Sequence, residues 1–308
     1  MSETETTPSP DAVWPSGKVG YVALLGRPNT GKSTLLNSVL HTHLAAVSAK
    51  PQTTRRRLLG VLSDDDSQIL FLDAPGVHVA KDILDEVMVE TIERVLSDAD
   101  LILCIADPTR APGQEDSLVA KRAASAGKTT ILAINKTDIA TPEQVEAMHQ
   151  FYRGVLGSTP SFRVAAVKPE TLPPLLAGIR AALPTGPFLY DPETLTDTIE
   201  RDIGAELIRE AVLENLRQEI PHGIAVAIES WNDNEKRCRI SAVLHVEREQ
   251  HKAIVIGKDG AMIKQLRIDA VKQLVELCGK RVDLRLWVKV SPDWRQHRRQ
   301  IQEFNLIS

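Results

Sequence analysis

The first part of the chain alternates short apolar runs with stretches of helical periodicity. The apolar runs have the length of buried strands and cover 19–25, 58–63, 68–73, 100–106, 129–135 and 161–167. Helical patterns lie between them, at 32–41, 82–97, 114–126, 142–156 and 171–182. This alternation predicts an α/β domain in which helices cover both faces of a mostly parallel sheet. Only residues 64–67 join the second and third strands, too few for a parallel crossover, so we expect an antiparallel pair and a mixed sheet.

A different pattern follows a break in the chain. Proline and glycine punctuate 184–197, which is typical of a linker. A long amphipathic helix is predicted at about 196–218, followed by a hairpin of two alternating runs at 224–229 and 239–247. The remaining elements are an apolar run at 253–256, a helix at 262–278, an alternating strand at 282–290 and a basic helix at 292–304. This order predicts a second domain of the α+β class.

The expected organisation is a leader at 1–17, an α/β domain at 18–183, a linker at 184–197 and an α+β domain at 198–308. The leader is polar and acidic, lacks the apolar stretch of a secretory signal, and is predicted to be disordered. No apolar run approaches the roughly 20 residues that span a bilayer. The sequence therefore favours a soluble cytosolic protein.

Charge is distributed unevenly along the 308 residues. The net charge of −4 excludes a protein that is basic throughout, yet residues 245–300 hold 13 Lys and Arg against 7 Asp and Glu. The second domain thus carries a basic field suited to phosphate. Cys104, Cys238 and Cys278 are too widely spaced for a metal motif or a disulfide framework, and we expect them to be buried thiols in a reducing compartment.

The stretch after the first predicted strand carries the strongest chemical signal. G-x-x-x-x-G-K-S at 26–33 lies between a strand and a helix, the context in which this spacing forms a phosphate-binding P-loop. Successive backbone N–H groups and the helix N-terminus attract anions. Lys32 would bring its charge to the β- and γ-phosphates, and the Ser33 hydroxyl would ligate Mg²⁺. These flanks disfavour a chance glycine-rich turn.

Two further motifs close predicted strands. In D-x-x-G at 73–76, Asp73 can reach Mg²⁺ through a water, and the Gly76 N–H can meet the γ-phosphate. In N-K-x-D at 135–138, the Asp138 carboxylate can accept hydrogen bonds from the N1–H and the exocyclic amine of guanine, whereas adenine presents the opposite polarity. Asn135 can brace the P-loop, and the stem of Lys136 can pack on the base. Each motif alone could be an ordinary turn or helix cap, but together they predict a guanine nucleotide site.

These motifs together resemble those of the translation-factor-like GTPases, and residues 26–29 resemble the Era branch in particular. P-Q-T-T-R at 51–55 is similar to the Era switch I, and the resemblance continues at 188–190, 195–197, 254–260 and 286–290. It covers about 18–308. It implies an Era-type GTPase in which a P-loop G domain is followed by a type II KH domain.

The resemblance assigns further roles in the G domain. Thr54 is expected to complete Mg²⁺ coordination with Ser33, and Lys32, Thr54 and Gly76 form the expected catalytic set. In the fifth motif, A-A-V at 165–167 stands where the family has Ser-Ala-Leu, so contact with the guanine oxygen is left to the backbone N–H of Ala166. The expected nucleotide-binding set is Asn29, Thr30, Gly31, Lys32, Ser33, Thr34, Asp73, Gly76, Asn135, Lys136, Asp138 and Ala166.

The source of positive charge for hydrolysis is left open. Val77 stands where Ras-like GTPases have a water-orienting glutamine, so slow intrinsic hydrolysis is expected. Asn29 resembles the asparagine with which related GTPases coordinate K⁺ between the β- and γ-phosphates. The alternatives are that Asn29 only braces the loop by hydrogen bonds, or that an arginine from 55–57 swings in.

G-x-x-G at 257–260 is a weak signal alone, because such pairs often end strands. The order α-β-β-α-α-β around it resembles a type II KH domain, in which this loop clamps the backbone of single-stranded RNA. The residues expected to bind RNA are Lys252, Gly257, Lys258, Gly260, Lys264 and Arg267. The basic tail, with Arg295, Arg298 and Arg299, could instead be a solvated helix face.

The resemblance implies a GTP-hydrolysing switch that binds the 3′ end of 16S rRNA and acts in the assembly and maturation of the small (30S) ribosomal subunit. GTP, GDP and Mg²⁺ are the expected ligands, and K⁺ is a further candidate. We expect a cytoplasmic monomer, with a peripheral contact at the inner face of the cell membrane left open. The rivals are an ATP-using P-loop enzyme, a passive RNA-binding protein with a vestigial G domain, and a GTPase recruited chiefly to the membrane. N-K-x-D disfavours the first, and intact Lys32, Ser33, Asp73 and Asp138 disfavour the second.

Overall fold

The computed structural model describes residues 14–48, 50, 53–217 and 220–306. Residues 1–13 of the expected leader, and Pro51 and Gln52 of the switch I motif, lie outside the described residues. Strand β1 (Ser16–Leu25) begins before the expected end of the leader, because its first residues pair with β7 (Thr185–Pro187). The first residues of the expected linker therefore form an edge strand of the sheet.

The first domain is built on a mixed sheet in the order β2-β3-β1-β4-β5-β6, with β7 beside the start of β1. The pair β2–β3 is antiparallel, as its short connection predicted, and the neighbours from β3 to β6 run parallel. β6 is shorter than expected, because the chain turns at 165–168. The strands not yet given are β2 (Leu58–Ser63), β3 (Ser67–Asp73), β4 (Leu101–Ala106), β5 (Thr129–Ile134) and β6 (Ser161–Arg163).

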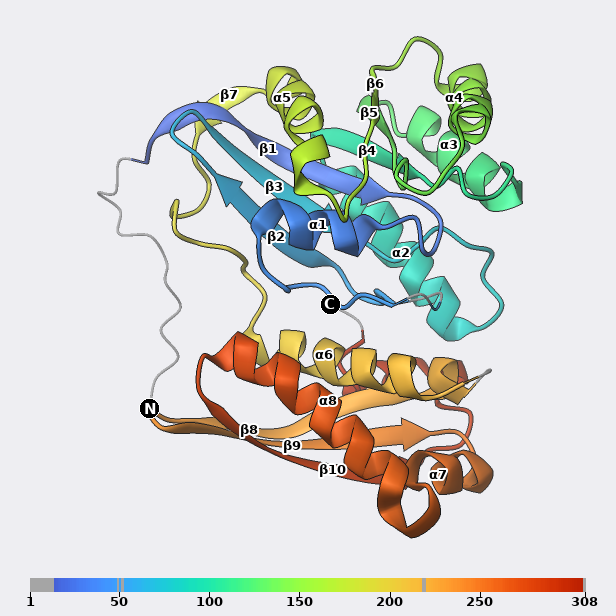
Figure 1. Ribbon diagram of the computed structural model, residues 1–308, viewed down its shortest axis with the longest axis vertical. Coiled ribbons are helices and arrows are strands. Elements are labelled where there is room, and N and C mark those ends of the chain that lie inside the picture. Colours follow the sequence, from blue (N-terminus) through green and yellow to red (C-terminus); the bar gives the residue numbers. More distant parts are fainter. Residues whose placement is uncertain (1–13, 49, 51–52, 218–219, 307–308) are drawn as a thin grey trace.

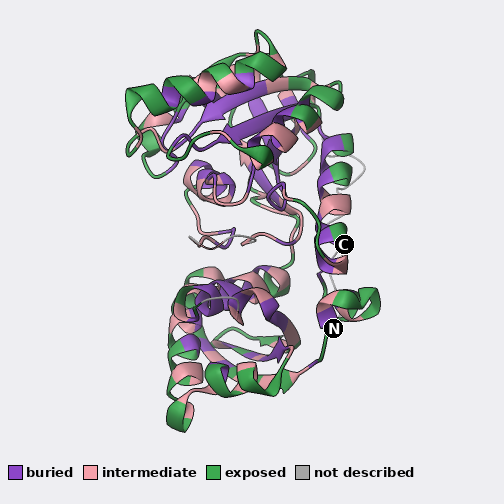
Figure 2. Ribbon diagram, turned by 90° about the vertical axis from the view of Figure 1, so that its right-hand side faces the viewer, coloured by how far each residue is buried: buried purple, intermediate pink, exposed green. Residues whose placement is uncertain are grey.

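Helices cover both faces of this sheet, as predicted (Figure 1). The buried side chains of α1 (Lys32–Leu40) and α5 (Pro173–Ala182) join one core cluster. Those of the second half of α2 (Ile83–Asp98), with those of α3 (Gln114–Ser125) and α4 (Pro142–Leu156), join a second cluster on the other face. Figure 2 shows the strands buried between helices with exposed outer surfaces. The carboxyl ends of β1, β3 and β5 meet at one edge, where ligands of such sheets bind.

The second domain has a three-stranded sheet in the order β10-β9-β8. β8 and β9 form the predicted antiparallel hairpin, and β10 runs parallel to β9. Helices α6 and α8 cover one face of this sheet (Figure 1). The elements are α6 (Glu200–Asn215), β8 (Ala225–Asp233), β9 (Arg237–Val246), α7 (Glu249–Ile256), α8 (Ala261–Cys278) and β10 (Arg281–Val290). This is the α-β-β-α-α-β order expected from the sequence.

The predicted helix at 292–304 is divided in two. A 3-10 turn (Trp294–Gln296) is separated from α9 (Arg298–Glu303) by His297, whose backbone is extended. The division lets Trp294 point into the protein, where it is fully buried and its indole N–H donates to the Gly223 carbonyl at 3.0 Å.

This C-terminal segment packs against α2 of the first domain. Trp294, Ile301 and Phe304 share a buried cluster with Leu84 and Val87 of α2. Arg298 also donates to Glu90 at 3.0 Å, and Arg295 pairs with Asp82 at 2.5 Å. A solvated basic face was therefore the wrong interpretation for Arg295, whereas Arg298 stays exposed beside Glu90. Arg299 remains largely exposed, beside Glu303.

Candidate functional site

The loop between β1 and α1 is shaped by close backbone approaches. Gly31 has φ +93°, and a Cβ at this position would lie 2.3 Å from Asn135 Nδ2. Only glycine fits, because both the backbone conformation and the contact exclude a side chain. Asn135 Nδ2 donates to the Thr30 carbonyl at 2.8 Å. The predicted bracing of the P-loop by this asparagine is therefore present in the structure.

Lys32 and Asp73 are two buried residues of opposite charge beneath the P-loop. Lys32 is almost fully buried, and its ammonium donates to the carbonyls of Arg27 (3.3 Å) and Gly26 (3.4 Å). Burial lowers the pKa of Lys32, and the Asp73 carboxylate partly offsets this. Burial likewise raises the pKa of Asp73, with Lys32 and the Ser33 hydroxyl opposing it. Both side chains therefore lie in a medium of low dielectric constant, where an added phosphate or cation would interact with them strongly.

Three oxygen-bearing side chains converge beside Lys32. Ser33 Oγ lies 2.9 Å from Thr54 Oγ1 and donates to Asp73 Oδ2 at 2.7 Å, while Thr54 Oγ1 lies 3.4 Å from the same oxygen. Asp73 Oδ1 is buried without a hydrogen-bond partner. Hydroxyl and carboxylate oxygens are ligands that Mg²⁺ prefers, and an unpaired buried carboxylate oxygen suits a ligand such as metal-bound water. The residues present therefore fit Mg²⁺.

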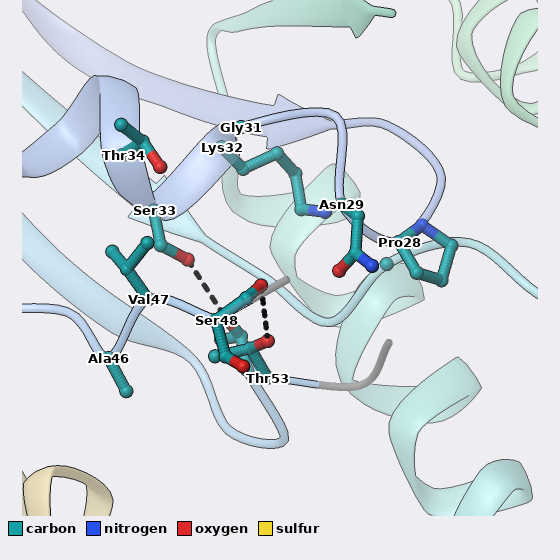
Figure 3. Close-up of a pocket in the computed structure, with 12 residues that line it drawn as sticks. Pro28, Asn29, Gly31, Lys32, Ser33, Thr34, Ala46, Val47, Ser48 and Thr53 are labelled. Atoms are coloured by element: carbon teal, nitrogen blue, oxygen red, sulfur yellow. Dashed lines mark hydrogen bonds between the residues drawn. The ribbon is translucent and has the colours of Figure 1, made fainter. Parts of the chain in front are cut away.

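Ser33 and Thr54 line one hollow together with residues of the P-loop, of 46–48 and of the loop after β3. Figure 3 shows Asn29, Lys32 and Ser33 turned toward this hollow from the P-loop side, and Ser48 and Thr53 facing them across it. Thr34 and Gly76 complete the lining from α1 and from the loop after β3. The structure thus brings the predicted phosphate and magnesium residues together. Thr30 lies just outside, fully buried, with its hydroxyl donating to the Arg27 carbonyl at 3.1 Å.

The N-K-x-D segment is tied to the P-loop through a second contact. Lys136 Nζ donates to the Asn29 carbonyl at 2.7 Å and to Asp107 Oδ2 at 2.8 Å. Asp138 is exposed at the end of β5, where it is available to a base. The Ala166 N–H donates to Asn135 Oδ1 at 2.8 Å, so its predicted contact with the guanine oxygen stays a prediction.

A buried ionic network supports these contacts, and the sequence analysis missed it. Arg27 lies within 3.4 Å of Asp107 Oδ2 and 3.3 Å of Asp116 Oδ1, and all three side chains are at most 5% exposed. Tyr152 also donates to Asp116, at 3.4 Å. Through Asp107 the network joins Arg27 of the P-loop to Lys136 of the base-reading segment. The only sign of this network in the sequence was Arg27 in the P-loop.

Val77, in the loop after β3, has no polar side-chain atom that could orient a water. Val77 is fully buried in the core, and its N–H donates to the Gly26 carbonyl at 2.9 Å. His78 follows, with Nδ1 2.7 Å from the Gly76 carbonyl and Nε2 3.1 Å from Asp85. The slow intrinsic hydrolysis expected from the valine at this position stays a prediction.

The three arginines after Thr54 are all directed away from the nucleotide hollow. Arg55 is buried, and its guanidinium donates to the carbonyls of His222 (2.7 Å) and Ile224 (2.8 Å) in the second domain. Burial lowers the pKa of Arg55 to about 9, and nearby Arg209 adds to this effect. Arg56 pairs with Asp202 at 2.8 Å and Arg57 with Asp197 at 3.3 Å. In this structure none of them supplies charge to the phosphates.

The G-x-x-G loop joins α7 to α8 with an unusual backbone. Gly257 and Gly260 have φ +74° and +76°, and Asp259 between them has φ +52°. A Cβ on Gly260 would meet nothing within 4 Å, so this glycine faces open space at the N-terminus of the 18-residue helix α8. Lys258, Lys264 and Arg267 are exposed on the loop and α8, and Lys252 is half-buried on α7. A helix N-terminus with nearby cations attracts phosphate.

The fold and these two sites define a P-loop GTPase joined to a KH domain. A family model described as 50S ribosome-binding GTPase matches residues 21–136, and one described as KH domain matches 219–295. GTPase Era of Caldicellulosiruptor saccharolyticus is 40% identical over 281 residues, which are 90% of this chain and 94% of that protein. GTPase Era of Caldanaerobacter subterraneus is 38% identical over 288 residues, 93% of this chain and 97% of that protein.

Two solved structures are similar over nearly the whole chain. A variant of Aquifex aeolicus Era bound to GDP and AlF4⁻ gives a TM-score of 0.90 at 35% identity, covering 94% of this chain and 100% of that one. The structure of Era in complex with MgGDPNP and nucleotides 1506-1542 of 16S ribosomal RNA also gives a TM-score of 0.90 at 35% identity. It covers 95% of this chain and 100% of that one. The chain belongs to the Era family of GTPases, and its reaction is the hydrolysis of GTP.

Proposed function

We propose that this protein is a GTP-driven switch that binds the 3′ end of 16S rRNA through its KH domain and acts in assembly and maturation of the small ribosomal subunit. The observation that carries the proposal is the presence, in one chain, of a converged nucleotide site and an open G-x-x-G loop at a helix N-terminus. The similar structure with 16S rRNA and GDPNP supports the choice of RNA. A cytoplasmic monomer is part of this proposal.

We assign the nucleotide site residue by residue. The P-loop amides at 29–34 and Lys32 would hold the β- and γ-phosphates, with Gly76 N–H at the γ-phosphate. Ser33 and Thr54 would ligate Mg²⁺ directly and Asp73 through water; when bound, this ion supplies charge to the phosphate oxygens. Asp138 would read guanine, with Lys136 packed on the base and Asn135 and Ala166 holding the pocket.

Hydrolysis in this site depends on positioning rather than on a general base. The attacking water must stand in line with the bond to the leaving β-phosphate, and Lys32, Thr54 and Gly76 are the groups placed to hold the γ-phosphate. Val77 cannot orient that water through its side chain, and we therefore expect slow turnover without a partner.

The switch is proposed to act through the segment after Thr54. Arg55 follows the magnesium threonine directly and is held by two carbonyls of the KH domain. A change at the γ-phosphate that moves Thr54 must therefore break or move a buried contact with the RNA-binding domain. Arg55, the residue next to Thr54, thus connects the state of the bound nucleotide to the second domain.

RNA binding is assigned to the loop and its flanks, with Lys252, Gly257, Lys258, Gly260, Lys264 and Arg267. A recruitment of the protein to membranes through its tail is less favoured, because Arg295 and Arg298 pair with acids of the first domain. In the described residues, no helix has the length and apolar character needed to cross a membrane.

The function is tested by crosslinking the purified protein to total ribosomal RNA by ultraviolet light with GDPNP, with GDP and without nucleotide. We expect crosslinks to concentrate at the 3′ end of 16S rRNA and to be strongest with GDPNP. Crosslinks scattered over both rRNAs, or equal in all three conditions, would contradict the proposed function.

We further propose that K⁺ at Asn29 supplies charge between the β- and γ-phosphates. Turnover is expected to be at least about tenfold faster in KCl than in NaCl at equal ionic strength, since charge at that place is worth about 10³–10⁵ when an arginine provides it. Asn29→Ala should remove the difference.

The control for Asn29→Ala is His41→Ala, because both residues have a left-handed backbone, with φ +63° and +51°. His41 lies at the other end of α1, so its variant should keep the K⁺ dependence. Equal wild-type rates in both salts would exclude the K⁺ mechanism and favour the view that Asn29 only braces the loop.

A further inference from the structure

The sheet of the KH domain has a face that α6 and α8 do not cover. Along β9 and β10 the side chains alternate, and Ile240, Ala242, Val282 and Leu284 are buried on the helix side. The intervening side chains point the other way. The strand register places Arg237, Arg239 and Ser241 opposite Arg281, Asp283 and Arg285, whereas Trp287 and Lys289 lie opposite the buried Val243 and His245. We call the following set the open sheet face: Arg237, Arg239 and Ser241 of β9, with Arg281, Asp283, Arg285, Trp287 and Lys289 of β10.

The open sheet face is strongly basic within a chain of net charge −4. Its eight side chains include five cations and one carboxylate, which gives +5 − 1, or +4. Asp283 lies 3.4 Å from Arg237 and 3.5 Å from Arg281, which are direct neighbours across the strands. Arg285 and Lys289 are exposed further along β10. Like charges in adjacent register repel, and an anionic ligand would relieve this repulsion.

Trp287 stands between Arg285 and Lys289 on the same face of β10. Its side chain is 47% exposed, whereas Trp294 is fully buried. Trp287 belongs to the L-W-V-K-V stretch at 286–290, whose leucine and valines face the helices. Packing in the core therefore does not explain a tryptophan at position 287. Its ring is available to a ligand on a basic surface.

The open sheet face continues into a hollow of about 1000 Å³. Arg237, Arg239 and Arg285 line it together with Ser230 and Asn232 of β8. The lining extends past the edge of β10 to Arg267 and Lys272 of α8. Since α8 begins at the G-x-x-G loop, a chain leaving that loop could follow the helix around β10 onto this surface.

We propose that the open sheet face binds a single-stranded RNA segment, in which a base stacks on Trp287 and the arginines and Lys289 contact phosphates. The inference rests on the proposed RNA-binding function and extends it to a second surface of the same domain. Cations combined with an exposed aromatic ring are typical of single-strand binding. A duplex would keep its bases stacked on one another, so the exposed ring favours an unpaired strand.

The test uses the full-length protein with GDPNP and a 16S rRNA 3′-terminal strand on the order of 16 nucleotides, longer than the four nucleotides that a G-x-x-G loop clamps. RNA should quench part of the tryptophan fluorescence of the wild type. Trp287→Phe should lose that part of the quenching and keep most of the affinity. Trp287→Ala should bind about five- to 150-fold more weakly, because stacking of a base on an aromatic ring is strong whatever the base.

A charge variant gives an independent readout. Arg239→Gln combined with Arg285→Gln should lower the salt slope of RNA binding by about 1.4, since each phosphate contact on a single strand contributes about 0.7. Lys121→Gln combined with Arg153→Gln removes the same charge from exposed positions on α3 and α4 and should leave the slope unchanged.

The outcomes separate this inference from the proposed function. Unchanged quenching in Trp287→Phe, or an unchanged salt slope in the arginine variant, would overturn the inference while loop variants could still abolish binding. Quenching of Trp287 by anionic phospholipid vesicles and not by RNA would also overturn it. If the wild type bound no RNA at all, the proposed function itself would fail.

Discussion

Replacing Asp138 with asparagine is expected to turn the nucleotide preference from GTP to xanthosine triphosphate. The carboxylate would accept from two donors of guanine, and an amide offers one acceptor and places its own donor against the second. Two hydrogen bonds to a charged group are each worth about 1.5–3 kcal/mol, so GTP affinity should fall by about 10²–10⁴-fold. Xanthine has a carbonyl where guanine has its amine, and the new amide can donate to it.

The structure indicates that this substitution would leave the contacts of Asn135 and Lys136 in place. Asp138 is exposed, and Asn135 and Lys136 are held independently by the P-loop carbonyls and Asp107. The measurement is competition of GTP and xanthosine triphosphate against a fluorescent guanine nucleotide, together with phosphate release from each. Asp98→Asn, at an exposed position at the end of α2, removes the same charge and should change neither. Wild-type GTP affinity in Asp138→Asn would refute the assignment of the base-reading carboxylate.

The nucleotide site could be predicted well because its motifs are local. The spacing at 26–33 specifies a turn and a helix start, and the structure places Lys32, Ser33 and Asp73 together as expected. Asn135 was expected to brace the P-loop and does so. In each case the residue lies next to a strand end, and the parallel sheet brings strand ends to one edge.

What the sequence did not reveal depends on partners distant along the chain. Arg27 pairs with acids 80 and 89 residues away, and no spacing rule connects them. Arg55 was considered as a residue that swings toward the phosphates, but its partners are carbonyls of the second domain. The basic tail looked like a solvated helix because its apolar residues, Trp294 and Ile301, gave no sign of the surface on α2 that they cover.

The second large effect is expected at the G-x-x-G loop, where Gly260→Asp should abolish RNA binding and leave GTP hydrolysis without RNA near normal. A carboxylate there would occupy the open space at the start of α8 and repel the phosphate that must approach it. Gly257 is a poorer site for the test, since its Cβ would lie 2.7 Å from Met262 Cβ and the fold would have to shift. Lys258→Ala should only weaken binding and lower the salt slope by about 0.7.

The matched control for Gly260→Asp is Gly279→Asp at the other end of the same helix. Gly260 and Gly279 are the N-cap and C-cap of α8, both are left-handed, and a Cβ on either would meet nothing within 4 Å. The two variants therefore impose similar backbone strain, which aspartate tolerates better than most residues. RNA affinity from fluorescence anisotropy and phosphate release would be measured for both, with thermal melting as a check of folding. Loss of RNA binding in Gly260→Asp alone would support the loop as the phosphate clamp, whereas equal affinity in the two folded variants would place the RNA elsewhere on the domain.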